Sequence, residues 1–218
     1  VHAARLLADL RTRILPYLRD NGNPRCFGYV MSPASAAGIA ADLITSALEQ
    51  NVTAWRSSPG ATELERLVVD WMRRIVGYPA GAGGLLTSGG SLATFTALSV
   101  ARTHHAPAAA VRSGLGRLEG RMMTIYMSQE GHMSVPRAAQ LLGLGTDAVR
   151  IMPVDASFRI DPRALDGAIR ADGRDGHLPF CVVASAGTVN TGHGLGRESI
   201  RCSRVIVPGF CPGRADQT

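Results

Sequence analysis

The strongest constraint on the fold is an alternation of short apolar segments with amphipathic segments between residues 123 and 185. Apolar runs bounded by turn residues predict strands, at residues 123–127, 149–154 and 180–185. Helical spacing of the apolar residues between them predicts helices, at residues 135–142 and 162–171. Asp161 is placed to cap the second of these helices, and Pro162 suits its first turn. Strands that alternate with helices indicate an α/β fold, a mainly parallel sheet with flanking helices.

The chain before this alternation is mostly helical by its pattern. Apolar residues at helical spacing predict helices over residues 1–20, 36–50 and from Thr62 onward, where Thr62 and Glu65 match a capping box. Residues 103–121, rich in Ala, Gly and Arg, are expected to form a surface excursion. We therefore expect three parts: an N-terminal helical segment, an incomplete α/β domain and an atypical tail, at residues 1–60, 61–192 and 193–218.

Composition narrows the classes of protein. The net charge of +6 comes from arginines spread from Arg5 to Arg214 without a basic block, so we expect no nucleic-acid partner. No apolar run approaches the roughly 18 residues needed to span a bilayer, and the chain begins with Val1, so a soluble cytoplasmic protein is expected. The four cysteines lack C-x-x-C spacing, which predicts a reduced protein and no metal site.

A strand, a glycine turn and a helix are predicted within a few residues of one another, at residues 85–87, 89–90 and 91–102. Free backbone N–H groups and the helix dipole converge at such a turn, which favours an anion such as phosphate. The alternative is an ordinary turn with Ser91 as the helix N-cap. Residues 143–148 fit a dinucleotide-binding pattern in letters, but they follow a helix and precede a strand, the reverse of its context.

Two further residues follow predicted strands at the same edge of the sheet. His132 comes shortly after the strand at 123–127, where open α/β sheets bind ligands, and its flat ring could stack on a planar group. Thr188 follows the strand at 180–185. The alternatives are a loop histidine that caps the next helix or is merely solvated, and a threonine in a plain turn.

Five segments occur in an order that resembles the group II pyridoxal-phosphate-dependent amino-acid decarboxylases, which include the aromatic-amino-acid and glutamate decarboxylases. They are residues 23–29 (NPRCFGY), 55–65 (WRSSPGATELE), 88–91 (SGGS), 128–134 (SQEGHMS) and 186–192 (AGTVNTG). The ordered set is more specific than any single segment. The resemblance covers about residues 5 to 192 and implies the large domain of a fold-type I pyridoxal-phosphate enzyme.

The resemblance also implies roles for individual residues. Gly90 and Ser91 would hold the cofactor phosphate, His132 would stack on the pyridine ring and Thr188 would lie beside the cofactor. Tyr29 would match a position in the substrate pocket. The family further implies a lyase acting on an L-amino acid, a small-molecule substrate, and a homodimer with its site near the subunit interface.

The chain departs from the family after residue 192. Neither the aspartate that pairs with the pyridine nitrogen nor the Schiff-base lysine appears, and all 23 basic residues are arginine. We therefore assign no catalytic residue and expect this chain to be inactive on its own. The change of character at His193 suggests a truncated or frame-shifted product of a longer gene, or alternatively a divergent tail.

Two other functions remain open at this point. One is a different fold-type I enzyme such as an aminotransferase, because a glycine turn does not fix the reaction type. The other is a non-catalytic protein that binds pyridoxal phosphate or pairs with another subunit. The tryptophan segment at 55–65 and the QEGH loop at 129–132 favour the decarboxylases by resemblance.

Overall fold

The structure is a computed structural model that describes residues 2–26, 28 and 32–192. The chain divides into two compact units, residues 1–59 and 60–218. Tyr29 and the tail from His193 lie outside the described residues, so the substrate-pocket residue and the tail stay predictions. The expected three-part division of the chain stays a prediction as well.

The first unit contains two helical segments, as the apolar spacing predicts. Helix α1 runs from Ala3 to Asp9 and continues through a π-helical turn, η1 (Leu10–Ile14), and a 3-10 turn, η2 (Leu15–Tyr17). Helix α2 (Ala36–Leu48) begins after Ser35, whose hydroxyl accepts the Gly38 N–H at 3.0 Å. It ends at Glu49, which takes the left-handed conformation.

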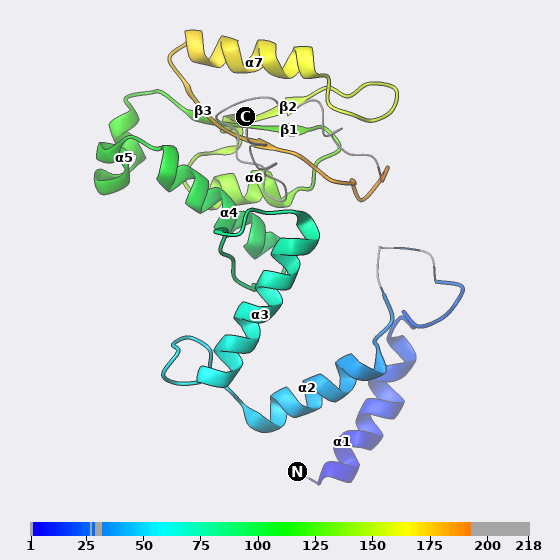
Figure 1. Cartoon of the computed structure of the whole chain (residues 1–218). Coiled ribbons are helices and arrows are strands. Elements are labelled where there is room, and N and C mark those ends of the chain that lie inside the picture. The colour runs from blue at the N-terminus through cyan, green and yellow to red at the C-terminus, as the bar shows by residue number, and fades with distance from the viewer. Residues whose placement is uncertain (1, 27, 29–31, 193–218) are drawn as a thin grey trace, which may run out of the picture. The chain divides into compact units, whose positions relative to one another are not determined.

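The second unit is built on a three-stranded parallel sheet, β1 (Met123–Ser128), β2 (Val149–Met152) and β3 (Leu178–Val183), in the order β2-β1-β3 (Figure 1). The chain passes from β1 to β2 through α6 (Ser134–Leu141) and from β2 back across to β3 through α7 (Pro162–Arg174). These two connections run in opposite directions along the sheet, so right-handed crossovers place α6 and α7 on opposite faces. The expected parallel α/β architecture is confirmed.

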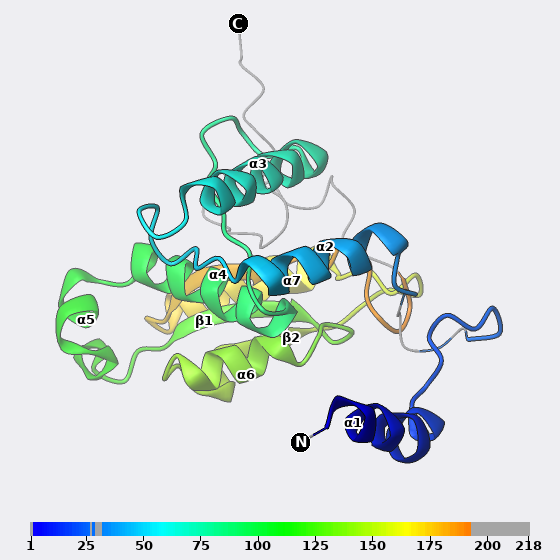
Figure 2. The same ribbon diagram turned by 90° about the horizontal axis from the view of Figure 1, so that it is seen from below.

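Helix α4 (Gly90–His105) packs beside α6 on one face of the sheet, and α7 covers the other (Figures 1 and 2). All six residues of the central strand β1 are buried. Its alternating side chains feed two cores: Ile125 and Met127 pack toward α4 and α6, whereas Tyr126 packs toward α7. The Asp161 cap is confirmed, because its carboxylate accepts the Arg163 N–H at 2.8 Å.

Three local predictions differ from the structure. Helix α3 (Pro59–Val76) begins three residues before Thr62, because Pro59 suits a first helical turn, and the capping box is therefore wrong. Glu65 instead accepts the Leu86 N–H at 3.1 Å. Residues 85–87 form no strand in the described structure, since no neighbouring strand pairs with them.

The stretch at 103–121 is the third difference, because it is only partly a surface excursion. It contains α5 (Ala108–Ser113) and a 3-10 turn, η3 (Leu115–Leu118). Ala110 and Leu118 are buried and join the core that α4 and α6 form with the sheet. Alanine-rich composition conceals these contacts, since a small side chain can pack in a core without giving a strong apolar signal.

Candidate functional site

The first turn of α4 offers backbone donors beside open space. The N–H groups of Gly90, Ser91 and Leu92 precede the first intrahelical hydrogen bond, from Ala93 N–H to Gly89 O at 3.0 Å. A methyl group added to Gly89 or Gly90 would meet no atom within 4 Å. Unpaired donors at the positive end of a helix dipole attract an anion.

Ser91 does not act as the N-cap of this helix. The N-cap is Gly89, and no side chain caps the helix terminus. The ordinary-turn interpretation therefore lacks the serine cap on which it depended, and Ser91 as a residue is exposed.

The loop after β1 is held tightly at its start. Ser128 accepts two backbone N–H groups: Glu130 N–H on its hydroxyl at 3.1 Å and Gly131 N–H on its carbonyl at 2.8 Å. A Cβ on Gly131 would lie 2.8 Å from Ser128 O and would also collide with the Met127 methyl group. Only glycine fits at this position without a shift of the loop, so residue 131 fixes the path of the loop that carries His132.

The His132 ring is anchored on one nitrogen and exposed. The Ser134 N–H donates to His132 Nδ1 at 3.1 Å, so Nδ1 is an acceptor and the neutral ring carries its proton on Nε2. This contact resembles the helix-capping alternative, because Ser134 is the first residue of α6. It leaves the ring accessible to a ligand, since the residue as a whole is exposed.

The structure brings the α4 turn and the His132 loop together. Thr94 Oγ1 lies 3.3 Å from Ser134 Oγ and donates to Gly90 O at 2.9 Å. Thr188 follows β3, the neighbour of β1, and its buried hydroxyl lies 2.6 Å from Thr191 Oγ1 in its own loop. Gly90 and His132 are thus joined by a chain of contacts through Thr94 and Ser134, whereas Thr188 follows a strand that ends at the same sheet edge. Their roles in ligand binding stay predictions.

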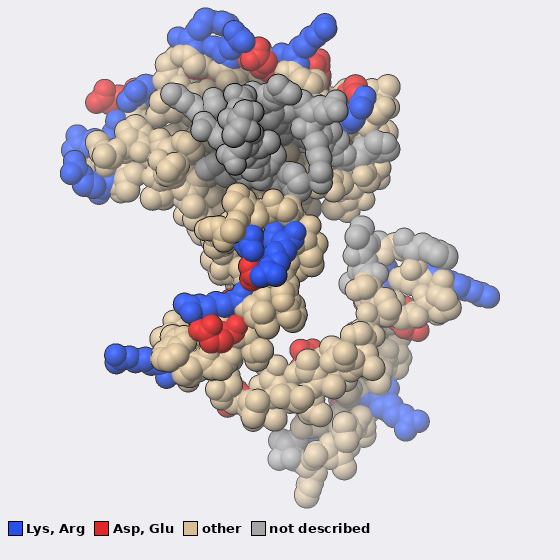
Figure 3. Space-filling view, viewed as in Figure 1, with Lys and Arg blue, Asp and Glu red and all other residues tan. Residues whose placement is uncertain are grey.

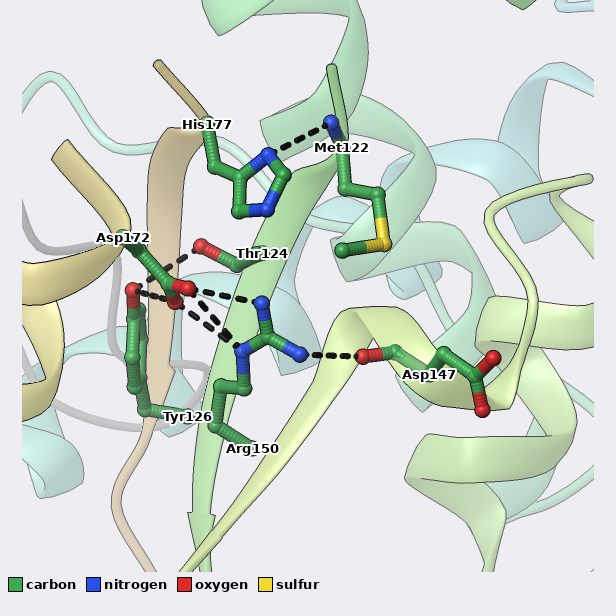
Figure 4. A network of polar contacts seen from close by, with 7 residues as sticks. All are labelled: Met122, Thr124, Tyr126, Asp147, Arg150, Asp172 and His177. Carbon is green, nitrogen blue, oxygen red and sulfur yellow. Dashed lines mark hydrogen bonds and ion pairs between the residues drawn. The ribbon is translucent and has the colours of Figure 1, made fainter. Parts of the chain in front are cut away.

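A polar network on the opposite face of β1 was not anticipated from the sequence (Figure 4). Asp172 of α7 pairs with Arg150 of β2 at 2.6 Å and accepts the hydroxyl hydrogen of Tyr126. Thr124 lies 2.9 Å from that hydroxyl, and Arg150 Nη1 also donates to Asp147 O at 2.7 Å. Each nitrogen and oxygen at the ends of the Arg150, Asp172, Tyr126 and Thr124 side chains has at least one partner, so the cluster is explained by its own hydrogen bonds without a ligand.

The pKa values of this network agree with a structural role. Burial acts to raise the pKa of Asp172, but hydrogen bonds from Arg150 and Tyr126 outweigh it and hold that pKa below the ordinary 3.8. Burial, followed by the hydrogen bond to Asp172, raises the pKa of Tyr126. The sequence did contain a sign of this buried carboxylate. Asp172 lies at helical spacing from Leu165 and Ile169, on the face of α7 that packs on the sheet.

Other kinds of site receive no support within the described part of the chain. Residues 2–26, 28 and 32–192 contain no group of three His, Cys, Asp or Glu side chains that could hold a metal ion. No helix in these ranges is both long enough and apolar enough to cross a membrane. Along the outer side of α7, basic and acidic side chains are intermixed (Figure 3), as in the exposed Arg170–Asp166 pair at 2.8 Å.

Comparison with known proteins identifies the family. Residues 2–194 match the model of the pyridoxal-dependent decarboxylase conserved domain, so the chain belongs to the pyridoxal-dependent decarboxylase family. It is 33% identical over 187 residues to an aromatic-L-amino-acid decarboxylase of Bacillus atrophaeus, a match that covers 86% of this chain and 37% of that enzyme. An L-2,4-diaminobutyrate decarboxylase of Rhizobium meliloti is 31% identical, with 87% and 36% covered. The chain thus spans less than two fifths of these relatives.

Solved structures agree with this assignment. Mouse CSAD in its apo form superposes with a TM-score of 0.84 at 29% identity, covering 91% of this chain and 41% of that one. Oryza sativa TDC with PLP and tryptamine superposes with a TM-score of 0.78 at 29% identity, covering 87% and 40%. The resemblance inferred from the five segments and the expected fold are confirmed.

The described residues fit one end of pyridoxal phosphate, the cofactor of this family. The cofactor phosphate requires donors next to unfilled space, and the first turn of α4 supplies both at Gly90 and Ser91. A flat ring needs a flat partner, and His132 presents an anchored, exposed imidazole. A covalent attachment requires a lysine, and this chain has none.

Proposed function

We propose that this chain forms the cofactor-binding part of a pyridoxal-phosphate-dependent L-amino-acid decarboxylase. The observation that carries the proposal is the run of unpaired N–H groups at Gly90 and Ser91, beside open space, in a chain whose residues 2–194 match this family. The α4 turn would bind the phosphate and His132 would lie against one face of the ring. Thr188, which follows β3 at the same sheet edge, would lie beside the cofactor.

When bound, pyridoxal phosphate supplies an electron sink that stabilises the carbanion left by loss of a carboxylate. The residues of this chain bind and orient the cofactor. His132, with Nδ1 occupied by the Ser134 N–H, keeps Nε2–H available as a donor at the open edge. Gly131 allows the loop that carries His132 to lie close against Met127 and Ser128 of β1.

We further infer that this chain alone does not carry out the reaction. All 23 of its basic residues are arginines, whose guanidinium groups remain protonated and do not act as the nucleophilic amine. Reversible binding of the cofactor without covalent capture is therefore the expected behaviour. The lack of lysine also favours a second candidate function, that of a non-catalytic subunit that binds pyridoxal phosphate.

Other properties of the whole protein extend this proposal. The relatives act, by their names, on aromatic amino acids or on L-2,4-diaminobutyrate, so we propose an L-amino acid as substrate class. We also propose a cytoplasmic homodimer. Two plant relatives are named phenylacetaldehyde synthase and 4-hydroxyphenylacetaldehyde synthase. By these names, proteins related to this chain form more than one kind of product.

The decisive experiment removes one phosphate donor without disturbing the helix. Gly90→Pro deletes a single N–H at the first helical position, where proline is tolerated. We expect the affinity for pyridoxal phosphate, measured by titration of its absorbance, to fall about tenfold or more. Ala36→Pro is the matched control, because it makes the same change at the first position of α2 and should leave the affinity unchanged. Equal affinities for the Gly90 variant and the control would refute the proposed phosphate site.

Reduction with borohydride separates the remaining alternatives. Treatment of the bound complex followed by peptide mass mapping should recover no cofactor attached to a side chain of this chain. Fusion to the C-terminal part of a longer relative, which supplies a lysine, should restore capture if the protein is a decarboxylase or an aminotransferase. Carbon dioxide release from an L-amino acid, as opposed to transfer of its amino group to an oxo acid, then separates those two.

A further inference from the structure

Helices α4 and α6 are tied by a directed pair of hydroxyl groups at the end nearest the candidate site. Thr94 has one hydroxyl hydrogen, and it donates to Gly90 O at 2.9 Å. The contact of 3.3 Å with Ser134 Oγ therefore requires the serine to be the donor. The resulting order runs from Ser134 through Thr94 to the carbonyl of Gly90.

The same serine also contacts the ring-binding side of the site. Its backbone N–H donates to His132 Nδ1 at 3.1 Å, and the residue is only 6% exposed. Ser134 therefore contacts the histidine through its backbone, and through its side chain it contacts Thr94, whose hydroxyl donates to Gly90 O. At the far end of the two helices, Arg102 Nη1 donates to Leu142 O at 2.8 Å, a tie that touches neither half of the site.

We propose that Thr94 and Ser134 are positioning residues that fix the distance between the phosphate-binding turn of α4 and the ring of His132. This inference rests on the proposed function, since it assumes a ligand that occupies both places at once. Such a ligand is bound tightly only when its two subsites are held in place before it arrives. A phosphate ion, which needs only the α4 turn, is indifferent to the pair.

Binding measurements on this chain test the proposal with five variants. Thr94→Val and Ser134→Ala should each weaken pyridoxal phosphate binding by about threefold to tenfold, as expected for one lost hydrogen bond. The double variant should be no weaker than either single one, because both remove the same contact. Thr94→Ser restores the hydroxyl and should restore the affinity. Arg102→Met should lower stability yet leave the affinity unchanged.

Inorganic phosphate separates positioning from direct binding. Its affinity, measured by competition or calorimetry, should be the same for wild type, Thr94→Val and Ser134→Ala. Additive losses in the double variant would overturn the proposal. Equal losses for phosphate and pyridoxal phosphate, or a loss in Arg102→Met as large as in Thr94→Val, would overturn it as well.

A spectroscopic readout keeps this inference distinct from the proposed function. The ring carbon and proton signals of His132, assigned by comparison with His132→Gln, should move in Thr94→Val and return in Thr94→Ser, with no ligand added. If wild type does not bind pyridoxal phosphate, the proposed function fails, and the ring signals alone decide whether the pair sets the position of His132. Signals that stay unchanged in Thr94→Val would reject the pair as positioning residues.

Discussion

Two sets of polar groups in the second unit, one between β1 and α7 and one at the first turn of α4, play different roles. Between α7 and the sheet, Asp172 of the helix accepts hydrogen bonds from Arg150 and Tyr126 of the strands (Figure 4). At the carboxyl edge, Gly90 and Ser91 present donors to open space. A buried cluster with complete hydrogen bonding stabilises a fold, whereas donors left without partners are available to a ligand. Whether the polar atoms already have partners therefore distinguishes the buried Asp172 cluster from the candidate site at the first turn of α4.

The largest effect should come from breaking the buried cluster. Asp172→Ala leaves the Arg150 guanidinium and the Tyr126 hydroxyl without their shared acceptor, and we expect a loss of about 3 kcal/mol in the free energy of unfolding in urea. Asp166→Ala is the matched control on the same helix, since its pair with Arg170 is exposed and contributes below about 1 kcal/mol. Similar losses for the two variants would mean that the buried cluster stabilises the fold no more than an exposed ion pair does.

The next effect concerns the loop that presents His132. Gly131→Ala introduces a methyl group 2.8 Å from Ser128 O, a backbone atom that cannot move freely because it accepts the Gly131 N–H. We expect a loss of about 2 kcal/mol in unfolding free energy together with weaker binding of pyridoxal phosphate. Gly167→Ala, inside α7 with open space around it, should instead stabilise the protein by up to about 1 kcal/mol. A stable Gly131 variant with normal binding would contradict this account of the loop.

Sequence patterns predicted local features and missed those made by distant partners. Asp161 and Pro162 mark the start of α7 because both act within one turn of chain. The strand expected at 85–87 failed because a strand needs a neighbour, and apolar content does not reveal whether one exists. The contact of Thr94 with Ser134 spans 40 residues, and that of Tyr126 with Asp172 spans 46. Such pairs follow from the crossing of helices over the sheet, which spacing along the chain does not encode.

The smallest effect is the pH dependence that the buried cluster gives to stability. Because the folded-state pKa of Asp172 lies below its ordinary value of 3.8, its contribution is present above that value and is lost as pH falls through the lower folded pKa. Tyr126, whose pKa is raised above 10.0 by burial and then by Asp172, adds stability that is lost as pH rises beyond that value. Unfolding free energies between about pH 3 and pH 6 should therefore fall more steeply on the acid side for wild type than for Asp172→Asn, which cannot titrate there. Asp166→Asn is the matched control, because it changes a carboxylate on the same helix whose pair with Arg170 is exposed. Parallel curves for wild type and Asp172→Asn would mean that the pair with Arg150 does not stabilise the fold.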